Sequence, residues 1–570
     1  MLLRRLIEYS EQIDMPPVMY TRTPVKWLID LAADGRFLGF IMQEGHGRRA
    51  DRGKELLAPD PGRRTVKIKP RLLCDNAEYV LGLVPEGKKA DRVAEQHRSF
   101  SQLIEKAAGN IDLPELEAVN EFLRSLPDGL PDLPEGMEAS HNITFRANDE
   151  LVMAHPEVQK WWAEYAGTES GEIAQCVICG KIRPCLERHP VAIKRVPGGQ
   201  TSGMAMVSAN VDAFLSYGLS ASMIAPTCLD CAERYAKSLN QLLSSESNSY
   251  RIGNTAFVFW TKEETDFDVL SFLDQPDTDQ VKELLRSGFT GKSYESVEAN
   301  AFYAAALSAS GARLVVRDWT ETTVSNVQAN LARWFRRQHM TDAWGAEGRP
   351  LGIYALVSSL YRDIGREMVP SVPRLLVKSA LTGTPLPDYL LYQAIKRMRA
   401  DPNPARNDRE DSFTMYSRMM LIRLVFNSHP DKEETFMSNM DINNREPAYI
   451  CGRLLAVLES IQHQAIPGAK ATLIDRYYGA ASAAPASVFG TLMRGAQPHL
   501  AKLRKEKEGA YYALQNRLMD IYSGLSEWPS TLSMKEQAIF ALGYYHQRAD
   551  DRARAREHSE EKKKSQENPE

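Results

Sequence analysis

The 570-residue chain has few cysteines, no long hydrophobic run and no excess of positive charge, and each shortage excludes a class of protein. Its seven cysteines are few and odd in number, which does not fit a secreted domain held by paired disulfides. No apolar run approaches the roughly 18 residues that a membrane-spanning helix needs. The N-terminal segment "MLLRRLIEYSEQ" also lacks the apolar stretch of a signal peptide. We therefore expect a cytoplasmic protein with no membrane partner, whose cysteines are thiols or metal ligands.

The balance of charges limits the kind of partner. The chain holds 70 Lys and Arg residues against 74 Asp and Glu residues, which gives a formal net charge of −4. A chain with this balance has no overall positive field, so any binding to nucleic acid must come from local basic patches. The length exceeds what one compact core holds and predicts about two to four domains.

The first half of the sequence has the pattern of mixed α and β structure. Strands are predicted where β-branched and aromatic residues run between turn signals, and a helix is predicted where the apolar spacing is helical. The predicted strands are 36–42, 65–70, 255–260 and 312–319, and the predicted helix is 90–108. A Pro- and Gly-rich stretch from Leu126, "LPDGLPDLPEG", reads as a surface loop.

The second half has the pattern of helices. Ser325 is a candidate N-cap for a first helix, and Ser533 with Glu536 forms a capping-box signature for a late one. The apolar positions at helical spacing are Val327, Leu331, Trp334 and Phe335, and later Leu454, Leu455, Leu458 and Ile461. The segment 400–412 reads as an exposed linker. After Ala555 no apolar residue follows, which predicts a disordered tail.

Two C-x-x-C pairs are the sharpest local motif. Such a turn directs two thiolates toward one ion, and a second turn completes the tetrahedral coordination of structural zinc. The predicted ligands are Cys176, Cys179, Cys228 and Cys231. Cys185 and His189 form a rival ligand set with the first pair. The alternative without a metal is a group of unrelated buried cysteines. A closed four-sulfur site stabilises a fold and leaves no position open for catalysis.

Two further stretches fit nucleic-acid binding. The segment from Arg48 to Arg71 carries nine basic residues against three acidic ones, a density that suits phosphates, although an isolated charge run is usually a solvated loop. It leads to Asn76, whose amide can read a base edge. The stretch from Gly198 to Asn210, "GGQTSGMAMVSAN", combines close backbone approach with neutral donors and acceptors. Taken alone, a glycine-rich loop of this kind is usually a turn.

Signatures of catalysis are missing. The sequence "GKS" at Gly291 copies the end of a phosphate-binding loop, but the first glycine of that motif falls on Arg286. Neither H-E-x-x-H nor G-x-S-x-G occurs, and the acidic residues form no evident nuclease constellation.

Several of these stretches together resemble the large subunit of the type I-C (Dvulg subtype) CRISPR interference complex, known as Cascade. The matching pieces run in the family's order and cover nearly the whole chain. They are "RTVKIKPRLLCDNAEYVLG", "GGQTSGMAMVSANVDAFLSYG", "AKSLNQLL" with "IGNTAFVFW", "ARLVVRDWTETTVSNVQANLARWF", "AYICGRLLAVLESIQ" and "YYGAASAAPASVFGTLMRGAQPHLAKL". The family commonly has other residues at positions 179, 228 and 231, so the zinc prediction rests on the cysteine spacing alone.

The resemblance implies a role without turnover. It implies a subunit that recognises the protospacer-adjacent motif in duplex DNA, starts strand separation and recruits a separate helicase-nuclease, while a crRNA reads the remaining sequence. The implied partners are the crRNA, the target double-stranded DNA, the backbone and crRNA-handle subunits and the helicase-nuclease. The residues that we expect to contact DNA are Lys67, Lys69 and Arg71 on phosphates, Asn76, Gln200, Thr201 and Ser202 on bases, and the loop positions Gly199 and Asn210.

The resemblance also implies that the C-terminal third is translated separately, from an internal start near Met437 or Met440, as a small subunit. Basic residues there are expected to face displaced DNA, namely Arg453, Lys470, Arg476, Arg494, Lys502, Arg504 and Lys505.

The fold class predicted from these observations is α+β, with small N-terminal sheets and a zinc-bound subdomain before an all-α C-terminal bundle. The expected domains are a mixed region with the basic segment (1–170), a zinc-containing region with the glycine-rich loop (171–320), a helical region with a linker (321–439) and a helical bundle with its tail (440–570). Two other functions fit less of the sequence. One is a CRISPR-RNA processing nuclease, and the other is a generic zinc-containing nucleic-acid adaptor.

Overall fold

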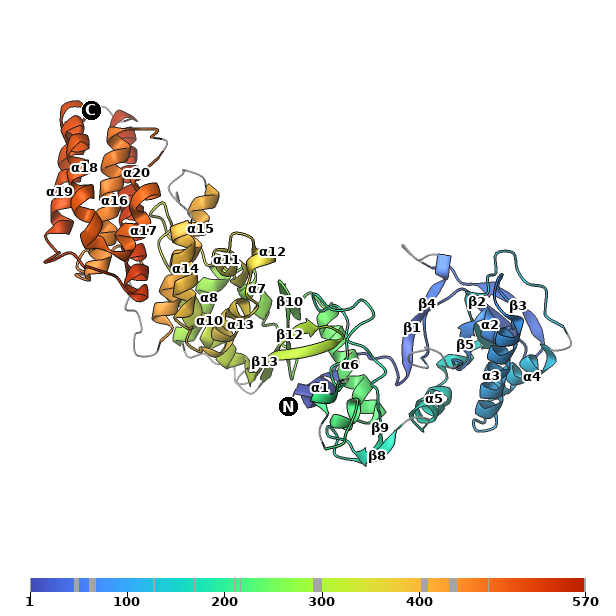
Figure 1. Ribbon diagram of the computed structural model, residues 1–570. Helices are drawn as coiled ribbons and strands as arrows, with labels where there is room; N and C mark the ends of the chain where they lie inside the picture. The colour runs from blue at the N-terminus through green and yellow to red at the C-terminus, as the bar shows by residue number, and fades with distance from the viewer. Residues whose placement is uncertain are drawn as a thin grey trace. The chain divides into compact units, whose positions relative to one another are not determined.

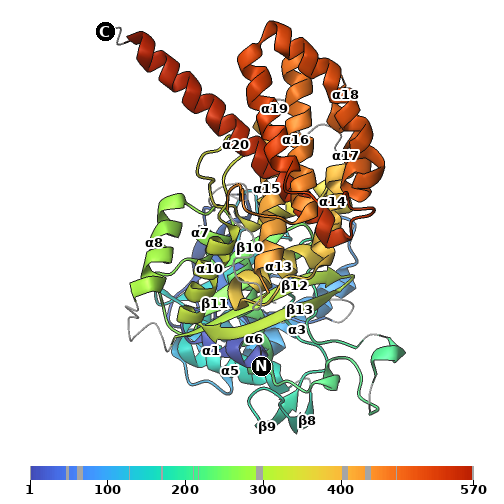
Figure 2. The same cartoon turned by 90° about the vertical axis from the view of Figure 1, so that its left-hand side faces the viewer.

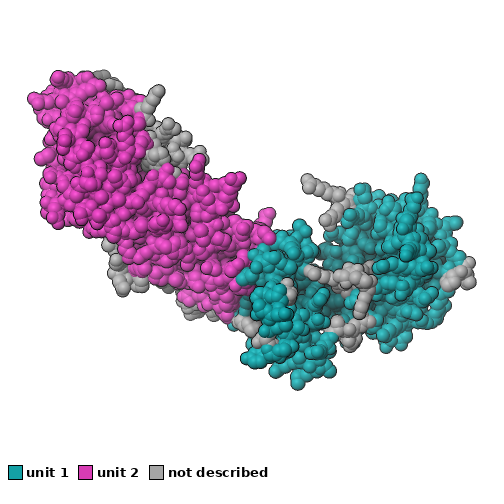
Figure 3. Space-filling view, viewed as in Figure 1, with its two compact units in different colours: residues 1–195, 199–244, 309–315 teal, residues 196–198, 245–308, 316–570 magenta. Residues whose placement is uncertain are grey.

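The chain forms two compact units, coloured separately in Figure 3. Unit 1 comprises residues 1–195, 199–244 and 309–315, and unit 2 comprises residues 196–198, 245–308 and 316–570. The structure is a computed structural model. It describes residues 2–45, 51–60, 68–126, 129–168, 171–209, 211–215, 217–290, 300–400, 409–429, 438–469 and 471–567.

Unit 1 is built around a five-stranded sheet with the order β3-β2-β6-β5, to which β7 adds by pairing with β6. Strands β2 and β6 are parallel, while β3 and β5 run antiparallel to their neighbours. A separate two-stranded sheet joins β1 to β4, and another joins β8 to β9. The strands are β1 (Tyr20–Val25), β2 (Trp27–Leu31), β3 (Phe37–Met42), β4 (Lys54–Pro59), β5 (Cys74–Asn76), β6 (Asn142–Ala147), β7 (Glu150–Leu151), β8 (Glu172–Gln175) and β9 (Ile182–Cys185).

Aromatic side chains hold helices against the five-stranded sheet. The ring of Phe145 on β6 lies between Phe100 and Phe122, with both ring-centroid distances at 6.3 Å. All three rings are buried in one hydrophobic core. The helices of unit 1 are α1 (Leu2–Ser10), α2 (Ala77–Val80), α3 (Ala90–Ala108), α4 (Pro114–Ser125), η3 (Val152–Ala154), α5 (Pro156–Thr168), η4 (Asp212–Phe214), η5 (Ser222–Ile224) and α6 (Leu229–Ser244).

Unit 2 contains a four-stranded sheet in the order β10-β11-β12-β13 and a larger set of helices (Figure 1). Strand β11 is buried from Thr255 to Trp260, which explains its unbroken apolar sequence. The strands are β10 (Ser249–Ile252), β11 (Thr255–Thr261), β12 (Ala301–Ser310) and β13 (Arg313–Thr323). The turn between β12 and β13 belongs to unit 1.

The helices of unit 2 share one hydrophobic core that extends from Tyr250 to Tyr545. The first group is α7 (Val269–Leu273), α8 (Thr278–Thr290), α10 (Val324–Gln338), α11 (Ile353–Ser358), α12 (Ile364–Glu367), α13 (Ser371–Thr382), α14 (Tyr389–Ala400) and α15 (Arg409–Asn427). The last group is α16 (Pro447–Ala465), α17 (Leu473–Ala483), α18 (Pro485–Glu506), α19 (Glu508–Tyr522) and α20 (Met534–Glu567).

Helix α16 is the centre of the last group, with α17, α18, α19 and α20 packed against it (Figure 2). Fourteen of its 19 residues are buried. Two glycines allow α16 and α20 to approach closely. A Cβ atom on Gly452 would lie 2.0 Å from the carbonyl oxygen of Phe540, and one on Gly543 would lie 2.2 Å from that of Tyr449. Any side chain at either position therefore forces these helices apart.

The structure confirms the α+β fold class and most of the predicted elements. The strands at 36–42, 255–260 and 312–319 are β3, β11 and β13, and the helix at 90–108 is α3. The capping box before α20 is present, because Ser533 N donates to Glu536 Oε2 at 2.6 Å and Glu536 N donates to Ser533 Oγ at 3.4 Å. No helix in the described ranges is both long and apolar enough to cross a membrane.

Three local predictions are wrong. The N-cap of α10 is Thr323, whose hydroxyl accepts from Asn326 N at 3.2 Å, while the hydroxyl of Ser325 meets that of Thr323. Residues 68–70 form no strand, and the rest of that predicted strand lies outside the described residues. Helix α20 continues to Glu567 instead of ending in a disordered tail. The segment after Ala555 is rich in Arg, Glu and Lys, which are good helix formers without any apolar partner.

Candidate metal centre and nucleic-acid interface

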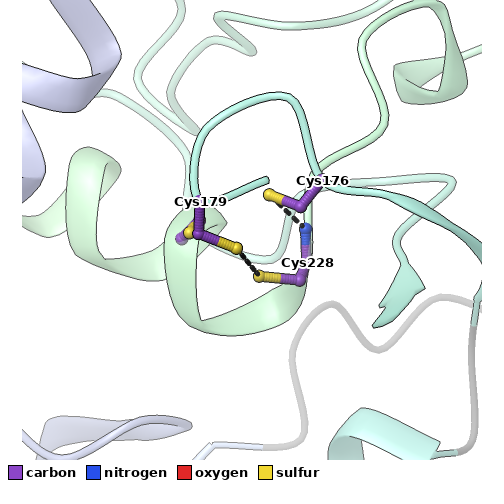
Figure 4. A group of neighbouring side chains, drawn as sticks. Cys176, Cys179 and Cys228 are labelled. Carbon is purple, nitrogen blue, oxygen red and sulfur yellow. Dashed lines mark hydrogen bonds between the residues drawn. The ribbon is translucent and has the colours of Figure 1, made fainter. Parts of the chain in front are cut away.

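Four cysteine side chains of unit 1 converge at one point. Figure 4 labels three of them, Cys176, Cys179 and Cys228. Cys176 and Cys179 lie in the turn that leaves β8, and Cys228 and Cys231 lie at the start of α6. All four sulfur atoms lie within 4.8 Å of one another. Cys179 is exposed, and the other three side chains are buried. The two C-x-x-C motifs therefore meet across 49 residues of chain, as their spacing predicts.

Backbone hydrogen bonds fix this arrangement. Cys176 N donates to Lys181 O at 2.9 Å, and Gly180 N donates to Cys176 O at 2.9 Å, which closes the turn that carries the first pair. Gly180 has a φ of 72°, a conformation that glycine adopts without strain. Cys228 N points at Cys176 Sγ over 3.5 Å, so a backbone amide near the start of α6 faces a ligand sulfur.

The chemistry of the cluster fits a tetrahedral zinc ion. The hydrogen bond with Cys231 lowers the pKa of the Cys228 thiol and raises that of Cys231, while burial raises the pKa of Cys179. Thiolates are the form in which cysteines bind zinc, and four of them leave no position open for substrate. The cluster is thus suited to a structural metal.

The rival ligand set is not assembled. Cys185 is buried beside the cluster, but its sulfur faces Ala174 O at 3.6 Å. The imidazole of His189 turns instead to the hydroxyl of Tyr235. In the part of the chain that the structure describes, the four cysteines are the only group of three or more His, Cys, Asp or Glu residues placed to hold a metal.

A cavity of about 1000 Å³ lies next to the cysteine cluster, entirely within unit 1. Its wall includes the segments 186–192 and 203–209 together with parts of α3, α5 and α6. Four of its lining residues are cationic and one is anionic. They are Lys69, Lys106, Arg188 and Arg313, with Glu187 as the carboxylate. We refer to it as the basic cavity.

The basic cavity also offers neutral and aromatic groups. Ser99, Gln102 and Gln200 contribute hydroxyl and amide groups to the lining. The ammonium of Lys106 lies 4.7 Å from the ring centroid of Tyr165, which presents an aromatic surface in the same wall. Cations, neutral hydrogen-bonding groups and an aromatic face together match the chemistry of a polynucleotide.

Two of the predicted DNA-contacting residues meet in this cavity. Lys69 comes from the basic segment and Gln200 from the glycine-rich loop, so the structure brings both stretches to one place. Of the remaining predicted residues, Gly199, Thr201, Ser202, Arg71 and Asn76 are not part of the lining that the structure describes. Lys67 and Asn210 lie outside the described residues.

Asn76 and Arg71 have local roles of their own. The side-chain oxygen of Asn76 caps α2 by accepting from Tyr79 N at 3.3 Å. Arg71 N donates to Asp75 Oδ2 at 2.8 Å, and its side-chain Nε is buried without a hydrogen-bond partner among the described residues. Both side chains are half-buried.

The glycine-rich loop is a closed hairpin loop. Ile193 and Met204 exchange two backbone hydrogen bonds of 2.8 Å, and Gly203 N donates to Gln200 O at 2.9 Å. Gly203 has a φ of 92°, and a Cβ there would lie 2.7 Å from the Cβ of Ala192. Only glycine fits this corner, which holds Gln200 at the wall of the basic cavity.

Sequence reasoning missed Lys106, Arg188 and Arg313. They lie far apart in the sequence, and only folding brings the three together. In the C-terminal helices, Arg453 does not face solvent as expected. It is buried, and its Nε donates to Gln547 Oε1 at 3.0 Å. Lys470 lies outside the described residues. The other basic residues predicted to face displaced DNA are exposed, namely Arg476, Arg494, Lys502, Arg504 and Lys505.

Comparison with known proteins gives the family. The model of the family CRISPR-associated protein (Cas_Csd1) matches residues 4–551, nearly the whole chain. The chain belongs to this family. Csd1 proteins are the large subunits of type I-C Cascade, so the resemblance seen in the sequence is confirmed. Membership in the Csd1 family implies a complex with crRNA and other Cascade subunits. No curated protein matches the chain.

Proposed function

We propose that this chain is the non-catalytic Cascade subunit that recognises the protospacer-adjacent motif in duplex DNA. It then promotes R-loop formation and recruits a separate helicase-nuclease. The observation that carries the proposal is the meeting of Lys69 and Gln200 in the wall of the basic cavity. One residue brings charge from the basic segment, and the other brings a neutral amide from the glycine-rich loop.

The two kinds of residue have different tasks in this proposal. Lys69, Lys106, Arg188 and Arg313 hold phosphates, which positions the duplex without reading its sequence. Gln200 faces the base edges, where an amide can accept and donate at once. Because the chain has a net charge of −4, the cavity must supply locally the positive field that the whole molecule lacks.

The closed metal centre supports a positioning role. A zinc ion bound by four thiolates would tie the β8–β9 turn to the start of α6, and both elements lead directly into the wall of the basic cavity. The ion would stabilise that wall without contacting substrate. The recruitment of the helicase-nuclease is supported by membership in the Csd1 family alone.

Binding measurements on the assembled complex with its crRNA test this function. We expect the complex to bind a duplex with the correct motif more tightly than one with the motif replaced. Gln200→Ala should reduce this preference by about 1–3 kcal/mol, the usual contribution of one bidentate base contact. A complex that binds both duplexes equally well contradicts motif recognition. Cleavage of crRNA precursor by the purified chain with divalent metal would contradict the non-catalytic role.

A further inference from the structure

The segment between Ala209 and Ala221 forms a loop that leaves the wall of the basic cavity. We call it the aromatic loop, and its described residues are 211–215 and 217–220. We propose that its Phe214 and Tyr217 stack on an unpaired base of the opened target DNA. The inference rests on the proposed function, because it assumes that the duplex is held in the basic cavity.

The base of the aromatic loop is held firmly. Ala209 N donates to Ala221 O at 2.9 Å, and both residues line the basic cavity. Just beyond, Ser222 Oγ donates to Val207 O at 2.8 Å, and Ser222 N donates to Glu187 O at 3.0 Å. These bonds join the loop to the two segments that form the cavity wall, so its tip projects from a fixed stem.

The tip of the loop is apolar and exposed. Tyr217 has 98% of its surface exposed, and Phe214 has 47%. The other large apolar side chains of the loop are also exposed, namely Val211, Leu215 and Leu219. None of these residues belongs to a hydrophobic core of the described structure. Exposed apolar side chains gathered on one loop indicate a contact outside the chain, which a single exposed residue would not.

Arg313 connects the aromatic loop to the basic cavity. Its guanidinium carbon lies 4.0 Å from the ring centroid of Phe214, and the same residue lines the cavity. A strand held by the cavity cations therefore meets a guanidinium and an aromatic ring at the cavity's edge. Bases stack on both kinds of surface, and unpaired bases do so without sequence preference. This continuity with a positive cavity favours a nucleic acid over a protein partner.

Two measurements on the assembled complex with crRNA test the proposal. The first is affinity for a short duplex that carries the motif but no match to the guide, so that it is bound without being opened. The second is the rate of R-loop formation on a complete target. Tyr217→Ala and Phe214→Ala should leave the first unchanged and slow the second about tenfold, as the loss of one base–aromatic stack predicts. Tyr217→Trp should retain the wild-type rate. Tyr392→Ala, with 50% of Tyr392 exposed on α14, is the matched control.

Each outcome separates the two ideas. If the wild-type complex shows no preference for the motif in the first measurement, the proposed function fails. If that preference stands and both alanine variants form R-loops at the wild-type rate, the stacking role alone is wrong. If the alanine variants fail to co-elute with the other Cascade subunits, the loop is a protein interface, and the stacking role is again overturned.

Discussion

The imidazole Nδ1 of His189 lies 2.5 Å from the hydroxyl oxygen of Tyr235, in the wall of the basic cavity. Tyr235 follows Cys231 by one turn of α6, and His189 follows β9, which pairs with the strand that leads to Cys176. The pair thus links the two halves of the cysteine cluster on the side of the cavity. Whatever loosens the cysteine cluster should therefore also loosen the cavity wall.

Metal analysis of the purified protein should give about one zinc per chain. The double variant Cys228→Ser, Cys231→Ser should lose it, because hydroxyls do not replace thiolates as ligands of structural zinc. Cys451→Ala changes a buried cysteine of α16, outside the cluster, and should retain the metal. A metal-free wild-type protein that remains folded and resists proteolysis between β8 and α6 would exclude a structural zinc.

Acid should destabilise the fold partly through His189. Burial lowers the pKa of its imidazole to about 4, from the ordinary value of 6.5. The unfolded chain gains this proton near pH 6.5, whereas the folded chain gains it only near pH 4. The folded state therefore loses stability as the pH falls through this window, by at most about 1.4 kcal/mol per pH unit. Between pH 7.5 and pH 4.5, the melting temperature of the His189→Asn variant should fall less steeply than that of the wild-type protein. Parallel curves for the two proteins would show that His189 is not buried as described.

Loss of a cavity cation should weaken DNA binding regardless of sequence. Lys69→Ala or Arg188→Ala removes a phosphate contact, so the slope of log affinity against log salt should decrease in magnitude by about 1. The preference for the motif should not change. Arg366→Ala is the control, because its side chain is 89% exposed and belongs to unit 2. Equal salt slopes for all the variants would place the duplex elsewhere.

Base reading by Asn76 can be separated from its capping role. Asn76→Ala removes the cap of α2 and should cost about 1 kcal/mol of stability, whereas Asn76→Asp keeps an oxygen that accepts from Tyr79 N. The aspartate lacks the amide donor of asparagine. If Asn76 reads a base, the complex should therefore lose motif preference with Asn76→Ala and with Asn76→Asp alike. If Asn76→Ala combined with Gln200→Ala leaves the preference intact, neither residue reads the motif.

The sequence predicts those parts of the site that are local in the chain. Each C-x-x-C turn brings two sulfurs together by itself, so the spacing pointed to Cys176 with Cys179 and to Cys228 with Cys231 as two ligand pairs of one site. The basic cavity is different, because Lys106 and Arg313 lie far apart in sequence and meet only in the folded unit. Local sequence also could not show that Arg453 turns inward, since its position depends on the packing of α20 against α16.

The C-terminal helices α16 to α20 contact one another and also contact residues that precede the expected internal start. Within the group, α16 is surrounded by α17 to α20. Residues upstream of the expected start also contact this group through α20. Arg399 donates to Gln537 Oε1 at 2.6 Å, and Tyr545 Oη donates to Thr341 O at 3.0 Å. A product that starts at Met440 would lose both partners and uncover part of the shared core. We therefore expect it to be less stable alone than inside the full chain.

Expression of the intact gene with a C-terminal tag should yield this shorter product beside the full-length chain. Intact-mass analysis identifies its first residue, which we expect to be Met437 or Met440, of which only Met440 lies within the described residues. Replacing both methionines with leucine keeps the apolar volume and should remove the short product alone. A wild-type gene that gives only the full-length mass would show that this member has no internally started subunit.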